Sequence, residues 1–383
     1  MPAPADPAPG SPPGPDPRSD PGADPLADPG APGSALPQPA SRHALSILRF
    51  PDPATHWVVV LVATLDEPVG DLTARVAALH REVPVLGARL DLTSGTEVWA
   101  PGAPPEPLLV AGEPLEQPAL DKPFELGAEA PLRILVGGGG RRLALAGHHA
   151  AFDGLSLVAV LVSLLGGEVP APVGSPPPGP AGSKLPLLKR LVRPADRVAP
   201  SSRRPRRDSF VTIEVAISGS QVTGRLAAAC AAACAAHNRL HSRRFTRIGI
   251  SVSKGGPAGV GNVASYRRID LDPSADVTAA VTAALATPDE PAEQVSSPKA
   301  MKLLTPIVAR FSDSFLMSNL GRHGVPGVER IDFFPVARGR SAVTFGSATV
   351  AGRQSTLTLR ARDLDPIDAR NLLHDAARRF AEG

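Results

Sequence analysis

One stretch of the chain constrains the fold more than any other. Residues 132–136 and 141–146 have the composition of two short strands, and the glycines of 137–140 between them fit the turn of a hairpin. Paired histidines and an Asp-Gly step follow, and the apolar run 155–165 is long enough for a buried helix. The pattern therefore predicts a β-hairpin that leads through the histidines into a buried helix.

The paired histidines, His148 and His149, lie where the second strand of this hairpin ends. Neighbouring side chains of a strand point to opposite faces, so only one of the two can face a given cleft. Asp153 falls near the N-terminus of the helix, where a carboxylate is favoured. The arrangement indicates a histidine general base at a strand end, and it is also consistent with two structural histidines and a simple helix cap.

The segment 148–154, His-His-Ala-Ala-Phe-Asp-Gly, resembles the HHxxxDG signature of the chloramphenicol acetyltransferase-like superfamily. This superfamily includes the condensation domains of nonribosomal peptide synthetases and the polyketide-associated acyltransferases. The resemblance implies an α+β fold of two similar lobes, each a two-layer α/β unit, with a cleft or tunnel between them. It also implies that His149 is catalytic, that His148 supports it, that Asp153 makes a structural ion pair and that Gly154 lets the turn close.

Residues 82–90 are similar to a second motif of this superfamily, in which an arginine-bearing strand pairs with the signature aspartate. A strand over 56–65 and a helix over 71–80 precede it, and a strand is expected over 85–90. Gly87 stands where condensation domains usually carry the first arginine, and Arg89 is the nearest substitute. Arg89 is therefore the arginine partner expected for Asp153.

The second half of the chain has the strands and helices of another lobe. The expected strands cover 210–217, 247–253, 261–271, 315–321, 342–352 and 354–360, and the expected helices cover 220–237 and 365–381. By resemblance, Asn262, Ser253 and the pair Ser318-Asn319 lie near the cleft, where a hydrogen-bond donor would stabilise an oxyanion. Ser318 and Asn319 would equally serve to satisfy backbone groups at a strand end.

Composition divides the chain into four parts. Residues 1–41 are rich in Pro, Ala, Gly and Asp and predict a disordered tail. The two lobes cover 42–170 and 209–383, and a basic, proline-rich linker joins them over 171–208. The positive charge of the linker is compatible with binding to nucleic acid, to an anionic membrane surface, or to the phosphates of coenzyme A and the acidic surface of an acyl carrier protein. It is equally compatible with a solvated linker that binds nothing. A net charge of +3 and the lack of a nucleic-acid motif argue against nucleic acid.

Several other kinds of site are excluded by their spacing. Cys230 and Cys234 lie on one face of a helix, where they suit neither a normal disulfide nor a zinc site, so we expect small core residues in a reducing, cytoplasmic compartment. The glycine-rich loop 254–261 lacks the Gly-Lys-Ser/Thr ending of a P-loop. The sequence predicts no secretory signal, no transmembrane segment, no metal and no permanently bound cofactor.

The function expected from these features is acyl transfer from a thioester to a hydroxyl or amine of a small-molecule acceptor, with His149 as the single base. Acyl-coenzyme A or a phosphopantetheine thioester would be the co-substrate, and an acyl carrier protein or synthase would be the partner. A second hypothesis is a non-catalytic docking module that keeps the fold and the motif. A hydrolase is disfavoured because the chain lacks a Gly-x-Ser-x-Gly elbow.

Overall fold

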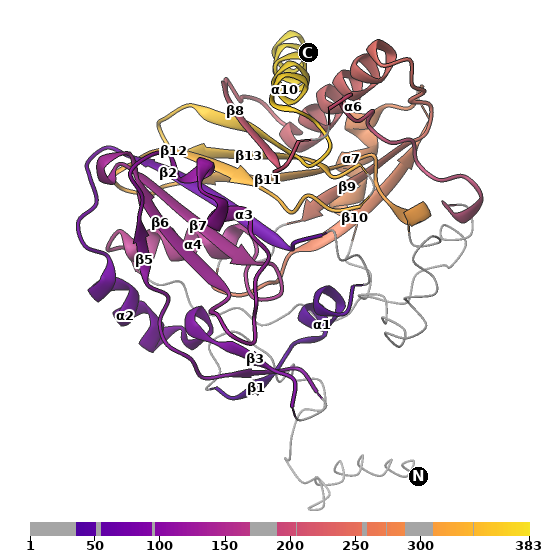
Figure 1. Cartoon of the computed structure of the whole chain (residues 1–383). Helices are drawn as coiled ribbons and strands as arrows, with labels where there is room; N and C mark the ends of the chain where they lie inside the picture. The colour runs from indigo at the N-terminus through magenta and orange to yellow at the C-terminus, as the bar shows by residue number, and fades with distance from the viewer. Residues whose placement is uncertain are drawn as a thin grey trace, which may run out of the picture.

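A computed structural model describes residues 36–50, 55–93, 96–168, 190–203, 205–254, 259–272, 274–287, 309–339 and 341–383. The described strands form one six-stranded, one five-stranded and one three-stranded sheet. Figure 1 shows the two larger sheets side by side with helices on their outer faces. The α+β architecture of two lobes is therefore confirmed.

The strands are β1 (Gln38–Pro39), β2 (Val58–Leu65), β3 (Arg89–Asp91), β4 (Val98–Ala100), β5 (Pro107–Leu109), β6 (Leu132–Gly137), β7 (Arg142–His148), β8 (Ser209–Val215), β9 (Ile248–Lys254), β10 (Ser265–Leu271), β11 (Phe315–His323), β12 (Val328–Phe334), β13 (Val343–Val350) and β14 (Ser355–Ala361). The helices are α1 (Arg42–Leu48), α2 (Thr73–Glu82), α3 (Pro118–Asp121), α4 (Gly154–Leu164), α6 (Val222–Leu240), α7 (Val277–Ala286) and α10 (Pro366–Glu382). Short 3₁₀ turns cover Pro84–Gly87, Pro114–Glu116, Gly138–Gly140 and Ala309–Phe311.

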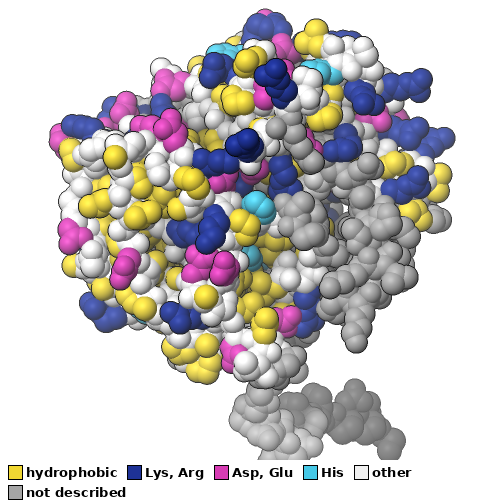
Figure 2. Space-filling model, viewed as in Figure 1, with side chains coloured by type: hydrophobic (Ala, Val, Ile, Leu, Met, Phe, Trp, Pro, Cys, Tyr) yellow, Lys and Arg dark blue, Asp and Glu magenta, His cyan; other side chains and the backbone are white. Residues whose placement is uncertain are grey.

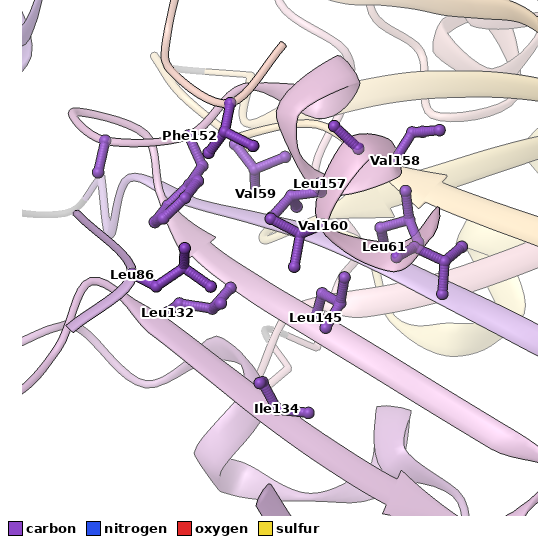
Figure 3. Packing of buried hydrophobic residues seen from close by; sticks show 14 of the residues in the cluster. Val59, Leu61, Leu86, Leu132, Ile134, Leu145, Phe152, Leu157, Val158 and Val160 are labelled. Atoms are coloured by element: carbon purple, nitrogen blue, oxygen red, sulfur yellow. The ribbon is translucent and has the colours of Figure 1, made fainter. Parts of the chain in front are cut away.

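The five-stranded sheet has the order β12-β2-β7-β6-β5, and β2 lies inside it. Val59 and Leu61 of β2 belong to the core beneath α4, whereas Val58 and Val60 belong to a second core on the opposite face. Because both faces of β2 are buried, its sequence is apolar except for Thr64 near its end, instead of alternating. Figure 3 shows Leu157 of α4 packed toward β2 and β7, which fixes the helix behind the paired histidines.

The six-stranded sheet has the order β10-β9-β11-β13-β14-β8. The Ala-rich α6 and the amphipathic α10 pack on one another and against this sheet (Figure 1). Cys230 and Cys234 on α6 are free and fully buried, as expected for small core residues. On α10, Leu373 and Ala376 are buried as expected, but Ile367, which the pattern placed on the same face, is 68% exposed.

β12 joins the two lobes, although by sequence it belongs to the second one. It pairs antiparallel with β2 in the five-stranded sheet. The strands that come before and after it along the chain, β11 and β13, both belong to the six-stranded sheet. The carbonyl of Phe333 accepts a hydrogen bond from the Thr358 hydroxyl, and Thr356 donates to the carbonyl of Ile331 at 2.6 Å. A Cβ on Gly346 would lie 1.9 Å from the Phe333 oxygen, so only glycine permits this crossing.

Several predicted boundaries were wrong. Residues 36–41, assigned to the disordered tail, contain β1 and the residue Ser41, whose side chain caps α1. The strand expected over 85–90 is a 3₁₀ turn followed by the short β3, because Pro84 and the following residues start a turn. The rest of the tail (1–35) and much of the linker (171–189) lie outside the described residues.

Candidate functional site

His149 follows β7 and lies at the junction of the two lobes. Its backbone N–H donates to the carbonyl of Trp57 at 2.7 Å, which fixes the residue beside the start of β2. Its carbonyl accepts a hydrogen bond from the side-chain amide of Asn262, which comes from the loop before β10. The His149 side chain is only 2% exposed. The local hairpin and a distant loop therefore hold this one residue together.

The hydrogen bonds of the imidazole define its tautomer. Nδ1 lies 3.1 Å from the carbonyl oxygen of Phe152, and a carbonyl only accepts, so Nδ1 carries the proton. Nε2 then has a free electron pair and accepts a hydrogen bond from the Tyr266 hydroxyl at 2.7 Å. Burial lowers the pKa of His149 to about 3, helped by the nearby His43 and Arg338. The ring is therefore neutral, with Nε2 able to accept a proton.

Aromatic rings enclose the imidazole of His149. Trp57 stacks on it with ring centroids 6.1 Å apart and an interplanar angle of 15°. His43 of α1 and Tyr266 of β10 approach it edge-on, with centroids at 6.3 and 5.8 Å. Trp57 adopts a left-handed backbone conformation, with φ of 51°, which is strained for a bulky side chain and is typical of functional sites. None of these three rings was predicted from the sequence as part of the site.

His148 faces away from His149, as alternation along a strand requires. Its Nδ1 accepts a hydrogen bond from the backbone N–H of Ala150 at 3.1 Å, and Phe124 packs edge-on against the ring at 5.7 Å. Burial lowers the pKa of His148 to about 3, with a contribution from Arg133. His148 lines a separate, mostly apolar pocket with Phe50, Phe124 and others, so it does not share the surroundings of His149's imidazole.

Asp153 caps α4 and links the two lobes. Its Oδ1 accepts from the backbone N–H and the hydroxyl of Ser156, both at 2.8 Å, and its Oδ2 accepts from the backbone N–H of Val263 at 3.1 Å. The hydroxyl oxygen of Ser156 accepts a hydrogen bond from the backbone N–H of Gly261 at 3.0 Å. Its single proton lies between Asp153 Oδ1 and the carbonyl of Gly261, so the hydroxyl bridges the two lobes. Burial raises the pKa of Asp153. Its carboxylate is satisfied by backbone and hydroxyl donors.

The arginine partner expected for Asp153 is not Arg89. The Arg89 side chain is exposed on β3, whereas Asp153 is 2% exposed, and none of the ion pairs within the described ranges involves Asp153. Gly87, the position at which the resemblance to condensation domains led us to look for an arginine, has no room for a side chain. A Cβ there would lie 2.3 Å from the carbonyl oxygen of Ala103. In the described residues, Asp153 is therefore held by the backbone N–H and hydroxyl of Ser156 and by the backbone N–H of Val263 in the second lobe, with no arginine.

Gly154 allows α4 to begin directly against the second half of the chain. A Cβ at this position would lie 2.6 Å from Leu320 of β11 and 2.7 Å from Phe333 of β12. Gly154 itself is buried at the first position of the helix. The glycine of the motif is therefore required by close packing between the lobes, whereas its backbone does not adopt the left-handed conformation that would call for glycine in a turn.

A cavity between the lobes brings most of the predicted site residues together. It is lined by Val59, His149, Asp153, Gly154, Leu155, Ser253, Ala264, Tyr266, Ser318, Asn319, Leu320, Phe333, Pro335 and Val336. The amide of Asn319 is engaged locally: Nδ2 donates to the Thr223 hydroxyl at 3.0 Å and Oδ1 accepts from the backbone of Gly321. Ser253 and Ser318 place hydroxyl groups on the strands that line the cavity. Asn262 lies behind His149 and supports its backbone.

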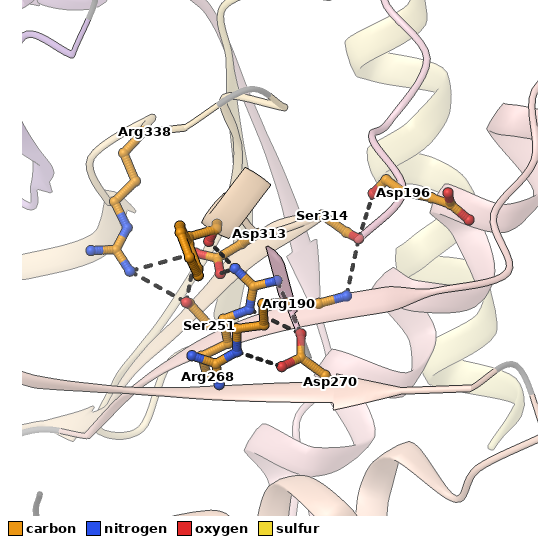
Figure 4. Close-up of polar contacts among 10 residues, drawn as sticks. Arg190, Asp196, Ser251, Arg268, Asp270, Asp313, Ser314 and Arg338 are labelled. Atoms are coloured by element: carbon orange, nitrogen blue, oxygen red, sulfur yellow. Dashed lines mark hydrogen bonds and ion pairs between the residues drawn. The ribbon is translucent and has the colours of Figure 1, made fainter. Parts of the chain in front are cut away.

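Tyr266 and Arg338 complete the polar surroundings of His149, and neither was predicted. The guanidinium of Arg338 lies 4.5 Å from the centroid of the Tyr266 ring. It is held by Ser251 at 3.3 Å and Asp313 at 3.5 Å, as Figure 4 shows. Burial raises the pKa of Tyr266 to about 12, so its phenol stays protonated. The only available signal was that this chain contains a single tyrosine.

Three arginines in the described part of the basic linker form ion pairs with the folded lobes. Arg190 pairs with Asp270 at 2.6 Å, Arg197 with Asp363 at 3.4 Å and Arg207 with Asp121 at 3.0 Å. Figure 2 shows Lys and Arg side chains interspersed with Asp and Glu on the viewed face. Within the described ranges, no helix is long and apolar enough to cross a bilayer, and no cluster of His, Cys, Asp and Glu could hold a metal ion.

Comparison with known proteins identifies the fold. No protein-family model matches the sequence, and no curated protein matches it. Among solved structures, the epimerization domain of the third module of tyrocidine synthetase B is 10% identical, with a TM-score of 0.55; the match covers 91% of this chain and 98% of that one. The first condensation domain of CDA synthetase is 14% identical, with a TM-score of 0.54, over 91% and 96% of the two chains. A mutant starter condensation domain of rhizomide synthetase, in complex with C8-CoA and Leu-SNAC, is 10% identical, with a TM-score of 0.54. That match covers 88% of this chain and 92% of the other. The chain thus has the condensation-domain fold that the HHxxxDG segment implied.

Proposed function

We propose that this protein is a condensation-type acyltransferase that moves an acyl group from a thioester to a hydroxyl or amine acceptor. The observation that carries the proposal is the state of His149: its ring is neutral, its Nδ1–H is fixed on the Phe152 carbonyl, and its Nε2 accepts a hydrogen bond from Tyr266, which lines the cavity between the lobes together with His149. The rhizomide synthetase structure with C8-CoA and Leu-SNAC supports a thioester as the acyl donor. Acyl-coenzyme A and carrier-bound phosphopantetheine thioesters both meet this description.

The reaction follows from the position of Nε2. The acceptor loses its proton toward His149 as its oxygen or nitrogen attacks the thioester carbonyl. The tetrahedral intermediate then collapses, the carbon–sulfur bond breaks, and the departing thiolate takes the proton back. Hydroxyl donors are available for the oxyanion at Ser253 and Ser318, since both residues line the cavity with His149. Asn319 is a weaker choice because its amide already bonds Thr223 and Gly321.

The test is mass spectrometry of products after incubating the purified protein with a panel of acyl-coenzyme A and acyl-carrier thioesters and candidate acceptors. His149→Ala is expected to lower transfer at least ~100-fold, the usual contribution of a general base. His374→Ala is the matched control, because His374 is exposed on α10, and it should retain full activity. Transfer that survives in His149→Ala would contradict the assignment of the base.

A non-catalytic docking module for a carrier protein or synthetase remains the second candidate function. The observation in its favour is that the Tyr266 hydroxyl already occupies the one proton-accepting nitrogen of His149. This hypothesis predicts no transfer from any donor, together with binding of an acyl carrier protein that is unchanged by His149→Ala. Isothermal titration with a carrier protein, run beside the transfer assay, separates the two functions.

A further inference from the structure

We propose that Tyr266 is a catalytic proton relay between the acceptor and His149. The inference rests on the proposed acyl transfer and names a second residue for it. Tyr266 donates its hydroxyl proton to Nε2 of His149 at 2.7 Å, and it lines the cavity between the lobes. No other polar group is recorded on that nitrogen among the described contacts.

The relative exposure of the two side chains favours a relay. His149 is 2% exposed and is enclosed by Trp57 and His43, whereas Tyr266 is mostly but not fully buried. Because the phenol oxygen occupies Nε2 and both residues line the cavity, an acceptor reaches Nε2 only through the Tyr266 hydroxyl or by displacing it. For direct contact with His149, the acceptor would have to displace a hydrogen bond of nearly ideal length.

Arg338 supports the partial negative charge that a relay places on the phenol. Its guanidinium lies 4.5 Å from the centroid of the Tyr266 ring, and Asp313 and Ser251 hold it there (Figure 4). A fixed positive charge over the ring favours the transition state in which the phenol proton is leaving. The ordinary ground state is a neutral phenol, and burial keeps it so.

The proton balance is complete without another reactant. As the acceptor attacks the carbonyl carbon, its proton passes to Oη of Tyr266 and the phenol proton passes to Nε2 of His149. When the carbon–sulfur bond breaks, the imidazolium returns a proton to Oη, and the phenol proton passes to the thiolate. Tyr266 and His149 end in their starting states, and the products are the acylated acceptor and a free thiol.

Tyr266→Phe removes the hydroxyl and keeps the ring that packs against His149. The relay predicts that single-turnover transfer falls ~100-fold, a loss typical of one proton-transfer group, while the KM for the donor is little changed. Thr282→Val is the matched control, since it removes a hydroxyl on α7 that bonds only within its own helix. If Tyr266 merely plugs the site, Tyr266→Phe will be as active as the wild type or more active, and the relay is refuted.

The single tyrosine of this chain allows a second test that needs no mutation. Biosynthetic incorporation of 3,5-difluorotyrosine changes Tyr266 alone and makes its phenol more acidic. A relay then predicts that the alkaline limb of the pH profile of kcat moves to lower pH, because a phenolate cannot donate to Nε2; a structural role leaves the limb in place. This variant also decides the outcome if Tyr266→Phe fails to fold.

The possible failures are distinguishable. Activity lost in His149→Ala but kept in Tyr266→Phe, with an unmoved alkaline limb, refutes only the relay. Activity that survives in His149→Ala refutes the base and the relay together. If the wild type transfers no acyl group from any donor, the catalytic role of Tyr266 is overturned along with the proposed function. The ¹⁹F signal of the labelled protein then still reports whether Tyr266 contacts His149, since that signal must shift in His149→Ala.

Discussion

Acidification from about pH 7.5 to pH 5 should destabilise the fold through the buried pair His148 and His149. Burial lowers the pKa of each to about 3. One nitrogen of each ring accepts a hydrogen bond, from Ala150 and from Tyr266, and a protonated ring loses that bond. Because the folded pKa lies below the unfolded value of about 6.5, the unfolded state takes up protons first, and stability is lost as the pH falls from 6.5 toward 3.

The magnitude follows from the same pKa difference. One pKa unit corresponds to about 1.4 kcal/mol, and pH 5 lies about 1.5 units below the unfolded value, so each histidine removes about 2 kcal/mol at pH 5. The loss from each histidine is roughly 13–40% of the total stability of a typical domain, which is about 5–15 kcal/mol, and it is readily measured.

The assay is urea unfolding followed by circular dichroism, at both pH values, for the wild type and His148→Gln. The variant cannot titrate at this position, so it should lose about 2 kcal/mol less on acidification than the wild type does. The difference between the two proteins cancels the contributions of other titrating groups. His374→Gln, at an exposed position, should behave as the wild type. Equal losses in His148→Gln and the wild type would refute the argument that a buried neutral histidine controls acid stability.

Three further substitutions test the packing of the site. Gly154→Ala places a Cβ 2.6 Å from Leu320 and should lower stability by about 1–3 kcal/mol through overpacking, measured by thermal unfolding; an unchanged Tm would contradict the close contact. Asp153→Asn keeps the cap of α4 but loses the hydrogen bond to the Val263 N–H, and it should lower stability by about 1–3 kcal/mol. The control Asp365→Asn changes the cap of α10, which makes no contact between the lobes, and it should lower stability by about a few tenths of a kcal/mol. Equal effects of the two variants would argue against a link between the lobes through Asp153. Arg360→Met removes the 2.7 Å partner of the buried Asp208, which keeps only the more distant Arg362 at 3.7 Å, and it removes the donor to the Val58 carbonyl. Denaturant unfolding should therefore show a loss of about 3 kcal/mol, and a neutral result would refute the role of this pair.

The local features of the site could be predicted from the sequence because they depend on neighbours along the chain. Strand alternation placed His148 and His149 on opposite faces, and the cap position placed Asp153 at the start of α4. The apolar runs gave β2 and α4, and the helical spacing put both cysteines in the core. Each of these is a short-range pattern of residue type.

The tertiary structure alone decided what surrounds the histidine. Tyr266, Arg338, Trp57 and His43 come from four separate segments, and no periodicity in a sequence reports that such segments meet. The partner of Asp153 was missed for a different reason: the donor is a backbone N–H, which every residue but proline carries, so it leaves no trace in residue identity. The sequence by itself placed the two histidines on opposite faces of a strand end, because alternation is a local property of a strand, and the packing of distant strands determined which groups surround each of them.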